Sequence, residues 1–138
     1  MVKKRILMID DEPAFTQMVK FALEKTGRYE VRTENLPVKA LDVATEFKPD
    51  LVMVDIMMPE MDGSQVAASF KADPKLGRIP LIFMTAIIPK EEINEAQESR
   101  GYILYVRKPA TLVQIINGIE EALEISQAGE ASEPATFS

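Results

Sequence analysis

An apolar run that ends in a single carboxylate is the feature that most constrains how this chain can fold. Residues 51–54 are all apolar, Asp55 follows them directly, and Pro59 stands four positions later. A short apolar run bounded by turn residues is typical of a strand that is buried on both faces. Ligands bind beyond the carboxyl ends of the strands in open α/β sheets, so the pattern predicts a functional site at Asp55.

Strand-like and helix-like segments alternate along the whole chain. Each strand-like segment is a short run rich in apolar residues, and a stretch with apolar side chains at helical spacing follows it; the strands are expected at 6–9, 29–33, 51–55, 79–84 and 103–106. Such alternation predicts an α/β fold, with a doubly wound parallel sheet that carries helices on both faces. The crossovers between the strands should be right-handed.

The length and the C-terminal composition predict one domain and a short tail. A chain of 138 residues is long enough for a single domain with a substantial core. From residue 126 the sequence is rich in Gln, Gly, Glu, Ser, Pro and Ala, which is typical of flexible segments. We therefore expect a domain over residues 1–125 and, at 126–138, a flexible tail or the start of a linker.

The composition excludes several kinds of chemistry. The chain has no cysteine and no histidine, which excludes disulfides, thiolate or histidine metal sites and the Ser-His-Asp triad. The net charge of −6 argues against nonspecific DNA binding, which needs clustered basic residues, so we expect this domain to bind no nucleic acid. No apolar run is long enough to span a bilayer, and we expect a cytoplasmic protein without membrane insertion.

Chemically active side chains stand at the ends of four predicted strands, namely Asp10 with Asp11, Asp55, Thr85 and Lys108. Carboxylates brought to one sheet edge would repel by about 4 kcal/mol per pair at about 4 Å and an effective dielectric constant of about 20. A hard cation such as Mg²⁺ would relieve this repulsion. An aspartate can act as a nucleophile and form an acyl phosphate, and a lysine and a hydroxyl can neutralise and orient the transferred group.

In this order, the residues resemble a response-regulator receiver domain, the phosphorylated half of a two-component system. The resemblance covers about residues 4–125 and rests on the two acids after the first strand, on Asp55, on Thr85 and on Lys108-Pro109. It implies a flavodoxin-like sheet with the strand order 2-1-3-4-5. It also implies a cis peptide bond between Lys108 and Pro109.

The resemblance implies that Asp55 accepts the phosphoryl group, with Thr85 and Lys108 as the other catalytic residues. Backbone N–H groups near Met57 and Ala86 should contact the phosphoryl group. Since the chain has no histidine, the donor should be another protein, either a histidine kinase or a histidine phosphotransfer protein. We expect a signalling domain rather than an enzyme, one that catalyses only its own phosphorylation and dephosphorylation and acts on a downstream protein that the sequence does not identify.

A metal site and a switch also follow from the resemblance. The metal ligands of the family correspond to Asp10, Asp11, Asp55 and the backbone carbonyl of Met57, so Mg²⁺ is the expected cofactor. The switch threonine corresponds to the residue at position 85, and its aromatic partner corresponds to Tyr105. This pair should change conformation on phosphorylation and alter partner binding.

Two other classes of function fit the same kind of sheet. A binding module could keep the fold and work without phosphorylation, although the intact acids, Thr85 and Lys108 argue against it. An enzyme is the other class, either a flavin carrier or an aspartyl phosphatase of the haloacid-dehalogenase type. Such phosphatases need a second acid two positions after the nucleophile, where this chain has Met57. The sequence also has no glycine-rich loop that could cradle a phosphate.

Overall fold

The chain folds into a parallel five-stranded sheet that is covered by helices, and the computed structural model describes residues 2–59, 61–85, 103–108 and 110–131. The strand order is β2-β1-β3-β4-β5 with every pair parallel, which confirms the predicted flavodoxin-like fold. The strands are β1 (Lys4–Ile9), β2 (Tyr29–Glu34), β3 (Leu51–Asp55), β4 (Leu81–Thr85) and β5 (Ile103–Arg107).

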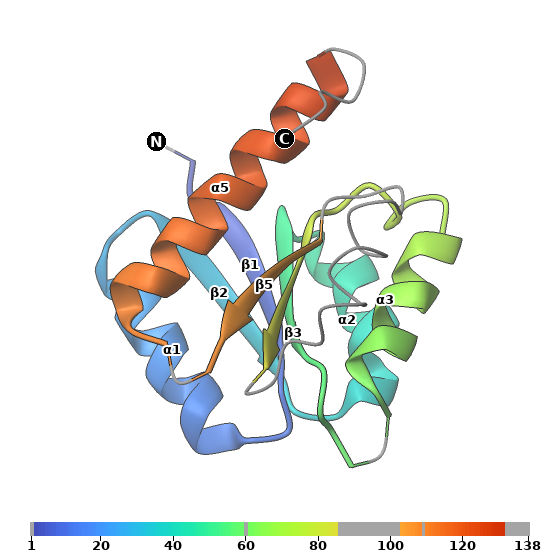
Figure 1. Cartoon of the computed structure of the whole chain (residues 1–138), viewed down its shortest axis with the longest axis horizontal. Helices are drawn as coiled ribbons and strands as arrows, with labels where there is room; N and C mark the ends of the chain where they lie inside the picture. Colours follow the sequence, from blue (N-terminus) through green and yellow to red (C-terminus); the bar gives the residue numbers. More distant parts are fainter. Residues whose placement is uncertain (1, 60, 86–102, 109, 132–138) are drawn as a thin grey trace.

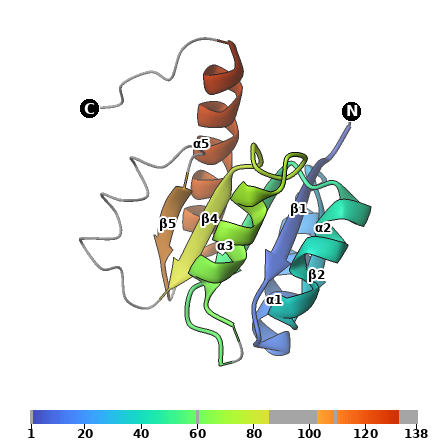
Figure 2. The ribbon, with the colours of Figure 1, turned by 90° about the vertical axis from the view of Figure 1, so that its right-hand side faces the viewer.

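Helices cover both faces of the sheet. α1 (Pro13–Lys25) and α5 (Leu112–Ala131) lie on one face, and α2 (Ala40–Phe47) and α3 (Gly63–Ala72) lie on the other (Figure 1). Figure 2 views the sheet from the side that α2 and α3 cover. A short 3-10 helix, η1 (Pro37–Lys39), leads into α2. The helix expected to begin near Pro89 lies outside the described residues, and none of the described helices is long and apolar enough to cross a membrane.

Successive side chains of the central strands enter two separate cores. In β3, Leu51 and Met53 pack with residues of α1 and α5, whereas Val52 and Val54 pack with residues of α2 and α3. β1 and β4 divide their side chains in the same way. Because neighbouring residues of a strand point to opposite faces and both faces are buried, these strands need apolar residues at every position. This requirement explains the continuous apolar runs in the sequence.

α5 is longer than the composition predicts. The helix continues to Ala131, and its last turns extend past the strands in Figure 1. Residues 126–131 are therefore helical, where a flexible tail is expected from the sequence. Ala, Gln and Glu are strong helix formers, and the single Gly129 costs only about 1 kcal/mol, so a polar composition does not end the helix. The rest of the expected tail, 132–138, lies outside the described residues.

Candidate functional site

The ends of β1 and β3 bring four carboxylates together. These two strands are direct neighbours in the sheet, so the residues that follow them meet at the same edge. One carboxylate oxygen from each of Asp10, Asp11, Glu12 and Asp55 lies within 4.8 Å of the others. Asp10 and Asp55 are buried, with 1% and 6% of their surfaces exposed. The three acids singled out in the sequence therefore belong to one cluster, which we call the acid cluster.

Lys108 supplies the cation of the acid cluster. It follows β5, and its Nζ atom lies 2.7 Å from Asp10 Oδ2, 3.2 Å from Asp55 Oδ2 and 3.7 Å from Glu12 Oε1. The ammonium donates hydrogen bonds to Asp10 and Asp55, and 16% of the lysine side chain is exposed. One positive charge therefore bridges the two buried carboxylates.

Backbone N–H groups hold the other oxygen of each buried carboxylate. The Glu12 N–H donates to Asp10 Oδ1 at 3.0 Å, and the Met57 N–H donates to Asp55 Oδ1 at 3.1 Å. In each carboxylate, one oxygen therefore accepts a hydrogen bond from a backbone N–H and the other accepts one from Lys108. This arrangement fixes the orientation of both carboxylates.

The loop after β3 returns and packs directly against Asp55. The Gly63 N–H donates to the Ile56 carbonyl oxygen at 2.9 Å, and a Cβ atom at position 63 would overlap the Asp55 carbonyl oxygen. Asp62 caps α3 and forms a capping box with Gln65. The Asp62-Gly63 turn therefore fixes the end of β3 and requires a glycine at its second position.

Burial and charge together set the ionisation of the bridge. Burial raises the pKa of Asp10 above its usual value, although hydrogen bonds from Lys108 and from the Glu12 N–H oppose the shift. Burial on its own would lower the pKa of Lys108, but the hydrogen bonds and charges of Asp10 and Asp55 outweigh it and raise that pKa. Lys108 is therefore a cation throughout the neutral range.

The strand end that carries Thr85 lies beside the acid cluster. Thr85 is the last residue of β4, and Met84 of the same strand pairs with Asp55. Ala86 and Pro109 lie outside the described residues. The contact expected of the Ala86 backbone and the cis bond before Pro109 therefore stay predictions.

Tyr105, the expected switch aromatic, lies in β5. Its ring centroid is 5.5 Å from that of Phe83 in β4, with the two ring planes tilted by 42°. The side chain is partly buried against the core formed with α2 and α3. This placement puts Tyr105 on the strand that precedes Lys108.

Among the described residues, the site also contains Glu12, Phe15 and Asn35, which the sequence did not single out. Glu12 adds a fourth carboxylate, and its signal in the sequence is its position next to the Asp pair. The Phe15 ring centroid lies 4.4 Å from Lys108 Nζ, and the Asn35 side-chain amide donates to the Asp10 carbonyl oxygen at 2.7 Å. Sequence spacing carries no signal for these last two contacts, because they depend on how distant elements pack.

The donors of the acid cluster suit Mg²⁺. All four are carboxylate oxygens, and Mg²⁺ prefers such hard ligands together with water. The position of the Lys108 ammonium between Asp10 and Asp55 also shows that these two acids accept a cation between them.

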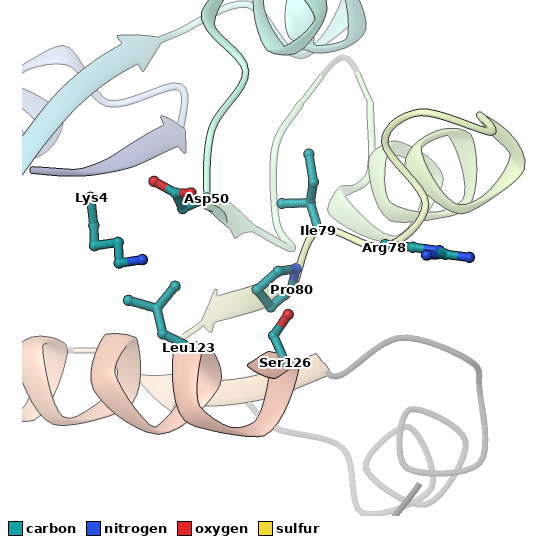
Figure 3. A pocket seen from close by; sticks show the side chains of 7 residues that line it. All are labelled: Lys4, Asp50, Arg78, Ile79, Pro80, Leu123 and Ser126. Carbon is teal, nitrogen blue, oxygen red and sulfur yellow. The ribbon is translucent and has the colours of Figure 1, made fainter. Parts of the chain in front are cut away.

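A separate pocket lies near the amino ends of β1, β3 and β4, at the opposite edge of the sheet (Figure 3). Its walls combine charged and apolar side chains, from Lys4, Asp50, Arg78, Ile79, Pro80, Leu123 and Ser126. The Asp50 carboxylate accepts a hydrogen bond from the Arg5 N–H at 2.8 Å. None of the residues that line this pocket belongs to the acid cluster.

Known proteins match the chain over most of its length. Residues 6–120 match the family described as the response regulator receiver domain. The polar-differentiation response regulator DivK of Brucella anthropi is 31% identical over 120 residues, which cover 87% of this chain and 96% of that protein. The DNA-binding dual master transcriptional regulator RpaA of Synechocystis sp. is 32% identical over 133 residues, which cover 94% of this chain. The match spans only 54% of RpaA.

Solved structures agree with these matches. The N-terminal domain of a response regulator receiver protein from Methanoculleus marisnigri is 35% identical, with a TM-score of 0.70, and the match covers 86% of this chain and 95% of that one. The chemotaxis protein CheY4 of Vibrio cholerae has the same fold, with a TM-score of 0.80 at 22% identity, over 88% of this chain and 99% of that one. The chain therefore belongs to the response regulator receiver domain family of two-component signalling.

Proposed function

We propose that phosphorylation of Asp55 switches this receiver domain. The observation that carries the proposal is the ion-pair bridge, in which Lys108 joins Asp55 to Asp10. Asp55 is also held by the Met57 N–H and lies beside Asp11. A carboxylate that can act as a nucleophile, a cation and further carboxylates that suit a metal ion therefore lie close together, which supports the proposal. Phosphoryl transfer depends mainly on such positioning and charge neutralisation.

In the proposed reaction, a carboxylate oxygen of Asp55 attacks the phosphorus of a phosphohistidine on a partner protein. An O–P bond forms and the P–N bond breaks, and the imidazole nitrogen leaves with the electron pair and takes up a proton. The product is an acyl phosphate. Attack of water on its phosphorus later restores the carboxylate and releases inorganic phosphate. The partner is a histidine kinase or a histidine phosphotransfer protein, and the domain catalyses only these steps on its own side chain.

Asp10, Asp11, Asp55 and the backbone carbonyl of Met57 are the proposed Mg²⁺ ligands. When bound, Mg²⁺ neutralises negative charge on the phosphoryl oxygens. Lys108 adds a second positive charge from the end of β5. With these groups in place, the carboxylate and the incoming phosphoryl group can approach despite their like charges.

Thr85 and Tyr105 are the proposed switch. The Thr85 hydroxyl and the Ala86 N–H would donate to the phosphoryl oxygens, and the Tyr105 ring would turn inward into the space that Thr85 leaves. Such a change needs contacts that differ between the two states, and the phosphoryl oxygens supply them. The phosphorylated domain then binds a downstream protein that the unmodified domain does not bind.

Incubation with acetyl phosphate and Mg²⁺ tests the proposal. Intact mass spectrometry should detect one added phosphoryl group on the wild type and none on Asp55→Asn, and removal of Mg²⁺ with EDTA should abolish the addition. Thr85→Ala should accept the group without the conformational change. Equal labelling of Asp55→Asn would show that another residue is the acceptor. An unlabelled wild type would instead favour a binding module that works without phosphorylation.

A further inference from the structure

The Lys108 ammonium lies against an aromatic ring as well as among the acids. Its Nζ atom is 4.4 Å from the centroid of the Phe15 ring. Phe15 belongs to the first turn of α1, and its partly buried ring packs against the core formed with α1 and α5. Packing against the core therefore fixes the ring, and one face of the ring is turned toward the Lys108 ammonium. An ammonium within about 6 Å of a ring centroid is attracted by the ring quadrupole.

The same ammonium binds carboxylate oxygens that a metal ion could use. It binds Oδ2 of both Asp10 and Asp55, while Oδ1 of each accepts from a backbone N–H. A divalent cation that binds these two acids would therefore compete with Lys108 for Oδ2, or coordinate Oδ1 with the positive charge of Lys108 close beside it. Any contact that favours the bridging position of Lys108 opposes metal binding.

We propose that Phe15 is a positioning residue, which holds the Lys108 ammonium against Asp10 and Asp55 and thereby weakens Mg²⁺ binding. The proposal rests on the Mg²⁺ site of the proposed function and adds a residue that sets its affinity. Phe15 touches neither the metal nor the phosphoryl group in this scheme. Its effect passes entirely through the lysine.

α1 offers a matched control for this contact. Phe21, on the same helix, has the Lys25 ammonium 5.7 Å from its ring centroid. The Phe21 side chain is 69% exposed, and neither Phe21 nor Lys25 belongs to the acid cluster. The substitution Phe21→Leu therefore removes a ring–ammonium contact from α1 without touching the bridge.

The test is a Mg²⁺ titration followed by NMR, using the amide signals of Glu12 and Met57. Phe15→Leu should tighten Mg²⁺ binding by about threefold to fivefold, as expected from the loss of a partly desolvated cation–π contact. Phe15→Tyr keeps the ring and should bind Mg²⁺ as the wild type does. Phe21→Leu should also leave the affinity unchanged. In a Lys108→Met background, Phe15→Leu should produce no further change.

The last comparison separates positioning from a general effect on packing. Tightening by Phe15→Leu that persists in the Lys108→Met background would overturn the proposal, as would an unchanged or weakened affinity in the Phe15→Leu single variant with its amide spectrum intact. A wild type that binds no Mg²⁺ would overturn the proposed function as well. The two failures are distinguishable. If only the role of Phe15 is wrong, the wild type still binds Mg²⁺; if the proposed function is wrong, it does not.

Discussion

At the scale of single residues, Lys108 is the cation that the described part of the chain places in the acid cluster. Lys108 is the ion-pair partner of both buried acids, Asp10 and Asp55. Removal of one member of a buried ion pair leaves the remaining charge uncompensated, which costs about 3–5 kcal/mol when the pair is fully buried. Exposure of 16% of the lysine side chain reduces that cost, because water can reach the site.

Lys108→Met should therefore lower the free energy of unfolding by about 1–3 kcal/mol in the absence of divalent metal. Added Mg²⁺ should restore more stability to the variant than to the wild type, because the vacated carboxylate oxygens bind it more tightly and ligand binding stabilises the native state. Urea denaturation in EDTA and in Mg²⁺ measures both effects. Lys25→Met, which removes a cation outside the cluster, is the control. Equal stability of Lys108→Met and wild type in EDTA would contradict the expected cost.

The residues of the bridge could be predicted from the sequence, but their surroundings could not. An apolar run precedes each of Asp10, Asp55 and Lys108. Because the carboxyl ends of parallel strands lie on the same side of a sheet, these runs predict that the three side chains lie close together. Phe15 and Asn35 reach the site from α1 and from the end of β2 through side-chain contacts. Those contacts depend on how the elements pack, and local residue spacing does not encode them.

At the scale of elements, the junction of β3 with α3 fixes Asp55, the proposed acceptor. Gly63→Ala would place a Cβ atom on the Asp55 carbonyl oxygen, and the neighbouring atom is backbone, which cannot rotate away. We expect the free energy of unfolding to fall by about 2 kcal/mol or more, as for other overpacked sites. The rate of phosphorylation by acetyl phosphate should also fall, because the end of β3 must shift.

Gly27→Ala is the control for this substitution. Gly27 has a φ of +79° and no atom within 4 Å of an added Cβ, so alanine there should cost about 1–2 kcal/mol through left-handed backbone strain alone. Its phosphorylation rate should match the wild type. Denaturation curves and labelling rates of the two variants separate lost stability from lost geometry. A Gly63→Ala variant that is phosphorylated at the wild-type rate would show that the junction does not position Asp55.

The strands of the sheet were easier to predict than the end of α5. A strand buried on both faces has almost no freedom in residue type, since each position enters one of two cores, and this constraint appears as an apolar run. The last turns of α5 extend past the strands (Figure 1). A polar composition does not by itself end a helix, because Ala, Gln and Glu favour the helical state, so composition is a weak guide to this boundary.

At the scale of the whole molecule, a hydrogen bond joins the edge strand β2 to α5. The hydroxyl of Tyr29, which is buried, donates to a carboxylate oxygen of Glu120, 91 positions along the chain. Burial, followed by the hydrogen bond to Glu120 and its negative charge, raises the pKa of Tyr29 from 10.0 to about 12. The unfolded chain ionises this tyrosine first, so the stability that neutral Tyr29 supplies is complete below pH 10 and is lost as the pH rises to about 12.

Tyr29→Phe should lower the free energy of unfolding by about 1–2 kcal/mol near neutral pH, since it removes a hydrogen bond to a charged acceptor. The difference from the wild type should shrink as the pH rises from 10 to about 12, because only the wild type has a hydroxyl that ionises. Urea denaturation at mildly and strongly alkaline pH measures the two values. A difference that stays constant across this range would show that Tyr29 does not titrate as its surroundings indicate.

The order in which the acid cluster is synthesised follows from the strands that carry it. Lys108 comes 98 residues after Asp10 and 53 residues after Asp55, so a growing chain presents both carboxylates before their cation exists. A chain interrupted before β5 lacks the lysine that forms the ion pair with both acids. When β5 joins the sheet, it adds the last strand beside β4 and brings the positive charge of Lys108 to the two acids. The complete acid cluster therefore exists only after β5 has been made, and the proposed phosphorylation of Asp55 has to wait for that strand.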